Sequence, residues 1–430
     1  MVVDIPYGDG VLNLTLPDDR VKAKLCPTGN MGDEFPIDAN DQEKVVIDAL
    51  AHPIESRPLH ELSAGKKRVT VITSDHTRPM PSAVTLPILF AEIRKGSPDA
   101  EITILVATGL HRATTAEELE ARFGAEIFRN EKIIVHDCKD GSTLRNIGVL
   151  PSGCELVLSK YALDTDLLIA EGFIEPHFFA GFSGGRKSVL PGVAGYECVV
   201  SNHCSSFIAD RNAAAGHLEG NPVHRDMVFA AEKASLAFIL NVMLDDERNI
   251  TDAVAGEPAR AHAEGCARLG RKAAVKRVTA PIVITSNGGY PLDQNLYQLV
   301  KCMDTAEKCC EEGGVIIAVG ECRDGIGGEA FYQDFAEGMS PKDLTKRFLS
   351  REPNETQTDQ WQSQILARIL EKRRVIVVAP LIEEAVKNMG LGFAGTLEAA
   401  LSIADEMLEK QQCNKPGIIV IPNGPGVVIV

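Results

Sequence analysis

The sequence of 430 residues is poor in the features that mark membrane, secreted and disulfide-rich proteins. No apolar run approaches the roughly 20 residues that a membrane-spanning helix needs. The first ten residues, MVVDIPYGDG, lack the basic start and apolar core of a secretory signal. The eleven cysteines include no CxxC pair, which is typical of a reduced intracellular protein. We therefore expect a cytoplasmic location.

Positive charge is also scarce. The chain has 44 Lys and Arg residues against 60 Asp and Glu residues, which gives a net charge of −16. An acidic surface repels nucleic acids and anionic lipids, so neither is expected as a partner. A local cationic pocket can still bind a small anion.

Short apolar runs recur along the chain and are separated by longer amphipathic stretches. The apolar runs are 69–74, 102–108, 132–136, 166–172, 281–286, 314–320, 374–380 and 417–422. Continuous apolar strands with helices between them predict an α/β fold with mostly parallel sheets covered on both faces. Some antiparallel β-structure is expected in the first 65 residues.

The length indicates two or three domains. A polar helical stretch over 259–277, followed by a fresh apolar run, predicts the boundary between two of them. We expect an N-terminal catalytic and cofactor-anchoring domain of residues 1–270 and a C-terminal α/β domain of residues 278–400. The last segment, 408–430, is expected to return to the first domain, because a terminal strand needs a sheet to pair with.

Ligands of open α/β sheets bind beyond the carboxyl ends of the strands, so the loops after the apolar runs are informative. The loop SDHTRPMP contains Asp75, which can accept hydrogen bonds or orient a neighbour, and Arg78, which can pair with a carboxylate. The alternative is a helix cap with a surface ion pair. The loop GLHRATT contains His111, a candidate acid or base whose alternative is a packed or solvated histidine.

The most informative segment is EPHFFAGFSGGRKSVLPG, residues 175–192. His177 is flanked by aromatic residues, and Gly184 and Gly185, with Gly181 before them, leave backbone N–H groups open to an anion. Lys187 closes the segment. A P-loop is excluded, because that motif needs glycine where Arg186 stands. The alternative is a glycine-rich turn with solvated basic residues.

Further candidates follow in the sequence. His203, in SNHCSS, is either a metal ligand or a buried structural histidine, and no His/Cys spacing indicates a metal held by protein alone. Tyr297, Gln298 and Lys301 have helical spacing and can face one cleft, or they belong to an ordinary amphipathic helix. Trp361 lies on a predicted helix, where core packing is the simplest role.

Taken together, SDHTRPMP, ATGLHR, EPHFFAGFSGGRKSVLPG, SNH, the Tyr297 to Lys301 helix and GECRDGIGGEAF resemble the nickel-dependent lactate racemase family. The resemblance extends from about residue 5 to the end of the chain. It implies two α/β domains with the active site between them. It also implies a nickel pincer nucleotide, a pyridinium-3,5-dithio compound, attached through a thioamide to the lysine matched by Lys187. The nickel would be held by a carbon and two sulfurs of that group and by His203.

The resemblance also assigns roles to the other candidates. It makes His111 and His177 the acid and base, places Asp75 near the cofactor, and makes Arg78 and Lys301 the groups that orient the substrate. Tyr297 and Gln298 lie beside them, and Trp361 matches a tryptophan of the cleft. Gly184, Gly185 and Arg186 are further expected to bind the cofactor phosphate.

The chemistry of the predicted reaction agrees with these residue types. Removing hydride from a 2-hydroxy acid leaves a neutral ketone, and the difficult step passes to a cofactor while a histidine takes the hydroxyl proton. The expected partners are a small 2-hydroxy acid, lactate first, and the proteins that build the cofactor. Other 2-hydroxy acids (malate, a longer or aromatic acid, a sugar acid) and a non-catalytic cofactor carrier remain open. A nicotinamide dehydrogenase is disfavoured, because no GxGxxG follows an early strand.

Overall fold

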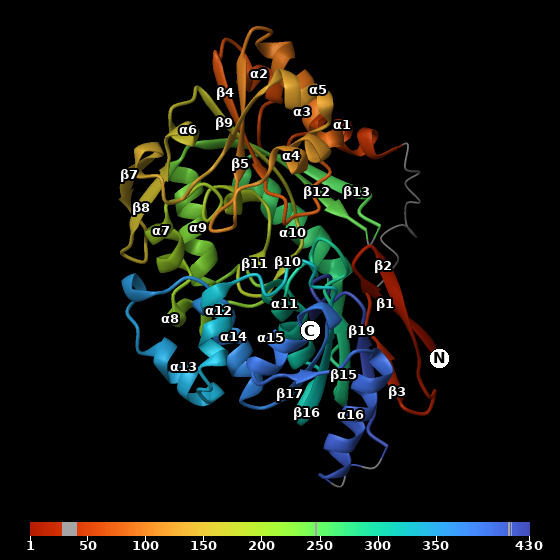
Figure 1. Cartoon of the computed structure of the whole chain (residues 1–430). Coiled ribbons are helices and arrows are strands. Elements are labelled where there is room, and N and C mark those ends of the chain that lie inside the picture. The colour runs from red at the N-terminus through yellow and green to blue at the C-terminus, as the bar shows by residue number, and fades with distance from the viewer. Residues whose placement is uncertain (28–40, 246, 412, 414) are drawn as a thin grey trace. The chain divides into compact units, whose positions relative to one another are not determined.

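The computed structural model of the chain describes residues 1–27, 41–245, 247–411, 413 and 415–430, which form two compact units (Figure 1). The first, here called the terminal unit, contains residues 1–27, 204–209 and 273–430. The second, the central unit, contains residues 41–203 and 210–272. Each unit is built on a six-stranded sheet.

The sheet of the central unit is mostly parallel. Its strands lie in the order β13 (Ile250–Gly256), β12 (Leu236–Leu244), β9 (Leu167–Phe173), β4 (Arg68–Ser74), β5 (Glu101–Ala107) and β6 (Lys132–Val135). Neighbouring strands are parallel, except that β12 and β13 are antiparallel. All seven residues of β9 are buried, as expected of a strand covered on both faces.

Helices cover both faces of this sheet (Figure 1). On one face, α1 (Gln42–Ala51) and α3 (Ser82–Gly96) contribute to a large apolar core with the strands. On the other face, α10 (Pro258–Ala273) packs Cys266 and Leu269 with Met243 of β12 and Val254 of β13. The other elements of the unit are α2 (Leu59–Ser63), α4 (Ala116–Phe123), α5 (Ala125–Asn130), η2 (Gly141–Thr143), β7 (Leu144–Val149), β8 (Glu155–Ser159), α6 (Lys160–Leu163), β10 (Pro176–His177), β11 (Gly181–Phe182), η3 (Gly185–Ser188), α7 (Tyr196–Asn202) and α9 (Pro222–Lys233).

The sheet of the terminal unit is parallel throughout. Its strands lie in the order β18 (Gly392–Phe393), β17 (Arg374–Val378), β16 (Cys310–Val319), β15 (Ala280–Ser286), β19 (Ile418–Ile421) and β3 (Val21–Lys24). The antiparallel hairpin of β1 (Val2–Tyr7) and β2 (Gly10–Thr15) packs on it together with α16 (Leu397–Glu409). The other elements are α8 (Ser205–Ile208), β14 (Ala274–Val275), α11 (Leu296–Glu307), α12 (Glu329–Ala336), α13 (Pro341–Leu349), η4 (Pro353–Glu355), α14 (Gln360–Leu370), η5 (Pro380–Ile382), α15 (Glu383–Asn388) and β20 (Val428–Ile429).

These sheets confirm the predicted fold class. All eight predicted apolar runs contain a strand, and residues 1–15 contain the expected antiparallel β-structure. The strands β12 and β13 were not predicted.

The unit to which the two chain ends belong differs from the prediction. Residues 1–27 and 408–430 were expected to belong with residues up to 270, yet both ends lie in the terminal unit. The reason is strand pairing: Ile282 of β15 pairs with Ile418 of β19, and β19 in turn pairs with β3. The apolar run 417–422 therefore completes the sheet of residues 273–430 rather than that of the central unit.

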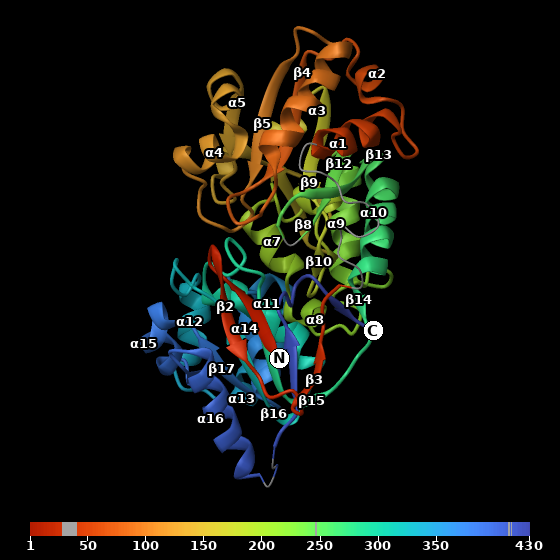
Figure 2. The same cartoon turned by 90° about the vertical axis from the view of Figure 1, so that its right-hand side faces the viewer.

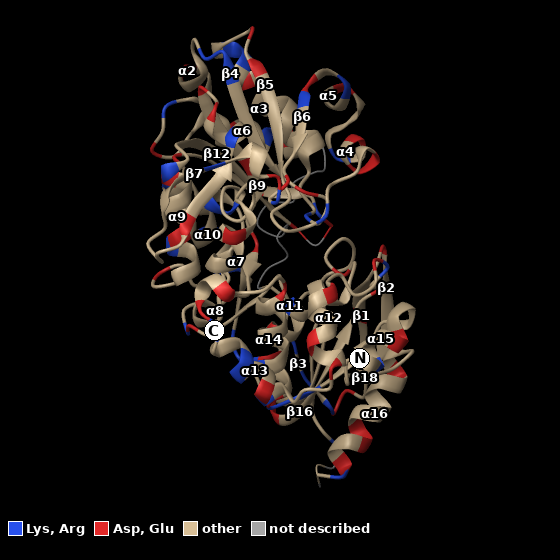
Figure 3. Cartoon of the chain, turned by 60° about the vertical axis from the view of Figure 1, so that its left-hand side comes forward, with Lys and Arg blue, Asp and Glu red and all other residues tan. Residues whose placement is uncertain are grey.

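Acidic residues outnumber basic residues in the sequence, and α16 of the terminal unit shows this excess. Figure 3 shows acidic ribbon along α16, which contains Glu398, Asp405, Glu406 and Glu409 and no basic residue. No helix in the described ranges is both long and apolar enough to cross a bilayer.

A buried carboxylate ties β9 to the start of α3. Glu171 of β9 accepts hydrogen bonds from the hydroxyls of Thr73 (2.5 Å), Ser82 (2.6 Å) and Thr85 (2.5 Å). Burial raises the pKa of Glu171, and these hydroxyls oppose the shift. Because Thr73 and Ser82 flank the loop after β4, Glu171 anchors both ends of that loop.

Substituting Glu171 is expected to loosen the central sheet. Glu171→Ala should cost about 2–4 kcal/mol, because three buried hydroxyls lose their acceptor and a cavity remains. Hydrogen–deuterium exchange resolved by peptide should then be faster in β4 and β9 and unchanged in β15 to β17. Glu171→Gln keeps the volume and one oxygen acceptor, so it should lose less. Wild-type exchange in the alanine variant would contradict this role.

Candidate active site

Three candidate loops of the central unit lie at one edge of its sheet. They follow β4, β5 and β9, which are parallel neighbours, so their carboxyl ends meet at the same edge. The loops are also joined directly, since the N–H of Gly109 donates to the carbonyl of Gly192 at 3.0 Å. The predicted gathering of these loops is therefore present in the fold.

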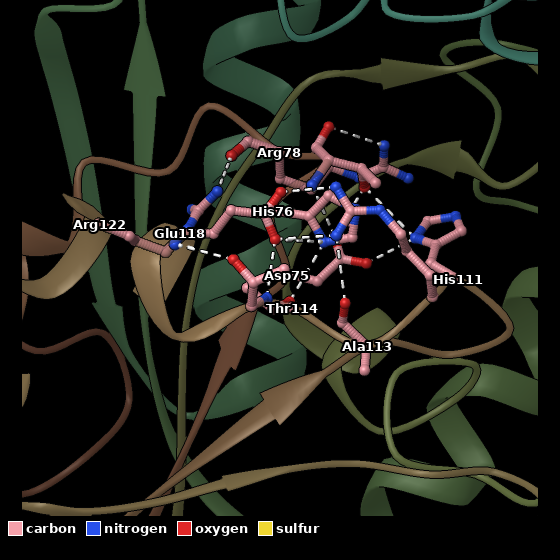
Figure 4. Close-up of polar contacts among 11 residues, drawn as sticks. Asp75, His76, Arg78, His111, Ala113, Thr114, Glu118 and Arg122 are labelled. Atoms are coloured by element: carbon pink, nitrogen blue, oxygen red, sulfur yellow. Dashed lines mark hydrogen bonds and ion pairs between the residues drawn. The ribbon is translucent and has the colours of Figure 1, made fainter. Parts of the chain in front are cut away.

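Asp75 and His111 form a close pair at this edge (Figure 4). Oδ2 of Asp75 lies 2.6 Å from Nδ1 of His111. The other carboxylate oxygen accepts from the hydroxyl of Thr77 at 2.6 Å and from its backbone N–H at 3.1 Å. Asp75 is buried, whereas the His111 side chain is 32% exposed. Asp75 is thus fixed by buried hydrogen bonds, whereas the His111 ring remains accessible to a ligand.

The charge state of Asp75 sets the role of His111. Burial alone would raise the pKa of Asp75, but the charge and hydrogen bond of His111, the Arg78 guanidinium and the Thr77 hydroxyl bring it well below its usual value. A carboxylate only accepts, so Nδ1 of His111 carries a proton and donates it. In the neutral ring, Nε2 then holds a lone pair that can accept a proton from a ligand.

Arg78 belongs to the same loop, and Arg122 of α4 holds the backbone of that loop. The Arg122 guanidinium donates to the carbonyl of Arg78 at 2.6 Å and to that of Met80 at 3.2 Å. Arg78 itself is only partly buried. A guanidinium on a braced loop beside His111 is suited to pairing with a carboxylate.

His177 lies on a short hairpin after β9. It is the last residue of β10, and it pairs with Gly181 of β11. Its Nδ1 accepts a hydrogen bond from the backbone N–H of Ala180 at 3.2 Å, so the proton of the neutral ring lies on Nε2. The rings of Phe178 and Phe179 pack against it, at centroid distances of 4.8 and 4.6 Å.

His203 has the features of a metal ligand. Its Nδ1 lies 2.9 Å from the carbonyl of Val199, which can only accept, so Nε2 keeps the lone pair. Burial and then the charge of Lys187 lower its pKa to about 3, and the ring is neutral near pH 7. The ring of Phe179 makes an edge contact with both His203 (5.1 Å) and His177 (4.6 Å). The structure therefore brings His177 and His203 together through Phe179, and the charge of Lys187 acts on His203.

The turn before Lys187 requires glycine. Gly184 and Gly185 have φ of +79° and +53°, a region that side chains disfavour. A Cβ on Gly184 would lie 2.8 Å from Oδ1 of Asn241, and one on Gly185 would lie 2.7 Å from the His262 ring. The N–H of Gly185 donates to Oδ1 of Asn241 at 2.8 Å, so this amide is already engaged.

The structure does not support the predicted phosphate contact of Arg186. Its guanidinium is buried and donates to the carbonyls of Ala180 (2.8 Å), Phe182 (2.8 Å) and Gly184 (3.2 Å). It also bonds to His224. The charged group points into the protein because the curled glycine-rich segment presents these carbonyls to it.

The candidates of the second half lie in the terminal unit. Gln298 and Lys301 are buried on α11, where Asn295 caps the helix by accepting from the N–H of Gln298 at 2.9 Å. The hydroxyl of Tyr297 accepts from Nε1 of Trp361 at 2.6 Å, which joins α11 to α14. A lysine and a glutamine inside a helix that is buried on almost every side do not fit an ordinary amphipathic helix.

Two groups of functional interest were not found from the sequence. Thr77 and Arg122 brace the loop of Asp75 and Arg78, and Asn241 with His262 supports the turn of Lys187. These residues lie far from their partners in the sequence or are of ordinary type, so no motif marks them. In the described residues, no group of three or more His, Cys, Asp or Glu side chains is arranged to hold a metal ion. A metal bound by His203 would need other donors.

The fold and the site define an α/β enzyme with histidines, a lysine and a braced carboxylate gathered around the sheet edge of one unit. Two family models match the chain: the lactate racemase N-terminal domain over residues 7–216 and the lactate racemase C-terminal domain over residues 275–429. The chain therefore belongs to the lactate racemase family, whose members are isomerases. The predicted resemblance is confirmed.

Known relatives match along the whole chain. A lactate racemase of Thermoanaerobacterium thermosaccharolyticum is 48% identical over 428 residues, 99% of each chain. One of Lactiplantibacillus plantarum is 43% identical over 430 residues, 100% of each chain. The structure of the lactate racemase apoprotein from T. thermosaccharolyticum matches with a TM-score of 0.93 and covers 100% of both chains. A Thermotoga maritima protein that is 19% identical shares the fold, with a TM-score of 0.66 over 93% of this chain and 99% of its own.

Proposed function

We propose that this protein interconverts the two enantiomers of lactate and that it uses a nickel pincer nucleotide held by Lys187 and His203. The observation that carries the proposal is the buried His203 ring, fixed by the bond of its Nδ1 to the carbonyl of Val199, in the same unit as Lys187 and the Asp75–His111 pair. The two relatives named lactate racemase, 48% and 43% identical, support lactate as the substrate.

The residues present fit such a cofactor. His203 offers one imidazole lone pair at Nε2, fixed by the bond of Nδ1 to Val199. An imidazole suits nickel together with soft sulfur donors, which a pincer group supplies. Lys187, in the same unit, provides a primary amine for the covalent attachment, and its charge acts on that ring. When bound, this group supplies the acceptor and donor of hydride.

The side chains of the central unit then perform the polar steps. The Arg78 guanidinium pairs with the substrate carboxylate and holds the acid in place. Nε2 of His111 accepts the proton of the 2-hydroxyl, and the Asp75 carboxylate stabilises the imidazolium that forms. Nε2 of His177, which carries a proton, faces the oxygen as a hydrogen-bond donor. The keto acid stays bound through its carboxylate while it presents its other face.

Roles in the terminal unit follow from the family resemblance. Lys301 and Gln298 are proposed to contact the substrate, since both are buried polar groups on α11. Tyr297 and Trp361 act as a pair through their hydrogen bond. We further propose a cytoplasmic location, consistent with buried thiols such as Cys309 and Cys310, and cofactor delivery by dedicated biosynthesis proteins.

A chiral assay tests the substrate. Protein produced together with the cofactor-building enzymes should convert each enantiomer of lactate into the racemate, with a higher kcat/KM than for malate, a longer hydroxy acid or a sugar acid. A clear preference for one of these other acids would replace lactate as the substrate. Binding of the cofactor without turnover of any acid would indicate a carrier and overturn the proposal.

Asp75→Asn tests whether Asp75 orients and stabilises His111 without contributing to substrate binding. The amide presents either an acceptor or a donor to Nδ1 but no charge, so the imidazolium of His111 loses its stabilisation. We expect kcat for lactate to fall about 10²–10⁴-fold with little change in KM. The matched control is Asp99→Asn, an exposed acid of the same unit, which should behave as wild type. Wild-type kcat in Asp75→Asn would remove the pair from the mechanism.

A further inference from the structure

The guanidinium of Arg186 lies at the centre of a buried polar cluster to which the proposed chemistry gives no role. We define the Arg186 cluster as the side chains of Arg186, His224 and His262. Arg186 is 3% exposed, and in the described part of the chain no carboxylate bonds to it. Burying a cation without a counter-charge is costly. The hydrogen bonds of this guanidinium therefore have to offset that cost.

Arg186 binds two segments that carry functional side chains. Its terminal nitrogens donate to the carbonyls of Ala180 and Phe182, both at 2.8 Å, and these residues belong to the hairpin of His177. One of the same nitrogens donates to the carbonyl of Gly184 at 3.2 Å, in the turn that leads to Lys187. One rigid, planar group thus spans the hairpin and the turn.

Two histidines from separate helices orient this group. Nε of Arg186 donates to Nδ1 of His224 on α9 at 2.9 Å, and Nη1 lies 2.9 Å from Nε2 of His262 on α10. Arginine has no acceptor, so Nδ1 of His224 must be unprotonated. Burial and the Arg186 charge lower the pKa of His224 to about 3, so its ring is neutral. The His262 ring also closes the space beside Gly185.

We propose that Arg186 is a positioning residue that fixes the hairpin of His177 relative to the turn of Lys187, and that His224 orients its guanidinium. The consequence for catalysis rests on the proposed function, whereas the effect on the two segments does not. Lysine cannot replace this arginine, because an ammonium group lacks the planar fork that reaches several carbonyls at once.

The test uses four variants and one control in the full-length protein, produced with and without the cofactor-building enzymes. Arg186→Lys and Arg186→Gln remove the fork. His224→Leu removes the acceptor, and His224→Asn keeps one, since the asparagine oxygen can take the place of Nδ1. Arg260→Gln is the control, because Arg260 is exposed and pairs with the exposed Glu55. The readouts are hydrogen–deuterium exchange over residues 173–190, the intact mass of the attached cofactor, and kcat and KM for each loaded enzyme.

The Arg186 variants should exchange faster over 173–190 than wild type, in the absence of cofactor as well. They should carry less attached cofactor, and kcat per loaded molecule should fall at least about tenfold while KM changes less than about twofold, since Arg78 lies in another loop. His224→Leu should show the same pattern to a smaller extent, and His224→Asn should restore wild-type values.

Wild-type exchange and wild-type kcat per loaded molecule in Arg186→Gln would overturn the inference, as would equal defects in His224→Leu and His224→Asn. If the Arg186 variants fail to fold, the comparison of His224→Leu with His224→Asn decides whether the proposal holds. If the wild-type protein neither carries the cofactor nor racemises lactate, the proposed function fails. The exchange comparison without cofactor then still tests whether Arg186 positions the two segments.

Discussion

Lys187→Ala is expected to abolish both cofactor attachment and lactate racemisation. The Lys187 side chain offers the amine for the covalent bond, and no other lysine lies in the segment 175–192. Without the attached group, side chains alone cannot assist removal of hydride from carbon, so turnover should fall by at least about four orders of magnitude. Intact mass and a chiral assay on protein made with the cofactor-building enzymes measure the two effects.

Lys187→Arg distinguishes attachment from charge. Arginine keeps a positive charge near His203, but its guanidinium does not serve as the primary amine. We expect it to be as inactive as the alanine variant and to carry no added mass. Lys233→Ala, which removes an exposed lysine of α9 in the same unit, should retain mass and activity. A cofactor mass retained by Lys187→Ala would refute the anchoring role.

The residues that could be predicted from the sequence are those whose type is unusual for their surroundings. His177, Lys187 and His203 lie in or near a segment dense in glycine and aromatic residues, and the sequence alone marks each as a candidate. His111 and Asp75 follow apolar runs, and the parallel order of β4 and β5 brings their loops together. For these positions, local pattern and sheet topology are sufficient to select candidates, and their roles in the reaction stay predictions.

Other features depend on pairings that a single sequence does not specify. From the sequence alone, the apolar run 417–422 could complete either sheet. Its pairing with β15 joins segments that are far apart in the sequence, which no local pattern predicts. The sequence favours an anion-binding role for Arg186, because it follows a glycine-rich segment whose backbone N–H groups can hold an anion. The curl of 180–184 instead turns four carbonyls toward it.

Glu171 shows an intermediate case. A carboxylate within the apolar run 166–172 was visible in the sequence, and a buried acid requires hydrogen-bond donors. Its donors, Thr73, Ser82 and Thr85, are common residues and became identifiable only when β9 was placed next to β4. The sequence thus predicts that Glu171 needs hydrogen-bond donors, but it does not indicate which residues provide them.

Both histidines are expected to be essential for racemisation, but in different roles: His111 as the base and His177 as a hydrogen-bond donor. Nδ1 of His111 faces the Asp75 carboxylate, whereas Nδ1 of His177 accepts the N–H of Ala180, so the two rings present different groups at Nε2. His111→Ala and His177→Ala should each lower kcat for racemisation about 10²–10⁴-fold, the usual contribution of a positioned acid or base. His52→Ala, at an exposed position, serves as the control.

Single-turnover measurements should separate the two roles. With loaded enzyme in excess over one enantiomer of lactate, the amount of bound keto acid reports the first half-reaction alone. If His111 is the base and His177 the hydrogen-bond donor to the oxygen, His111→Ala should block keto acid formation from both enantiomers, whereas His177→Ala should slow it for both. The double variant should be no slower than His111→Ala, because the effects of residues that act together on one step are not additive. Keto acid formed at the wild-type rate from both enantiomers in either single variant would exclude that histidine from the role proposed for it.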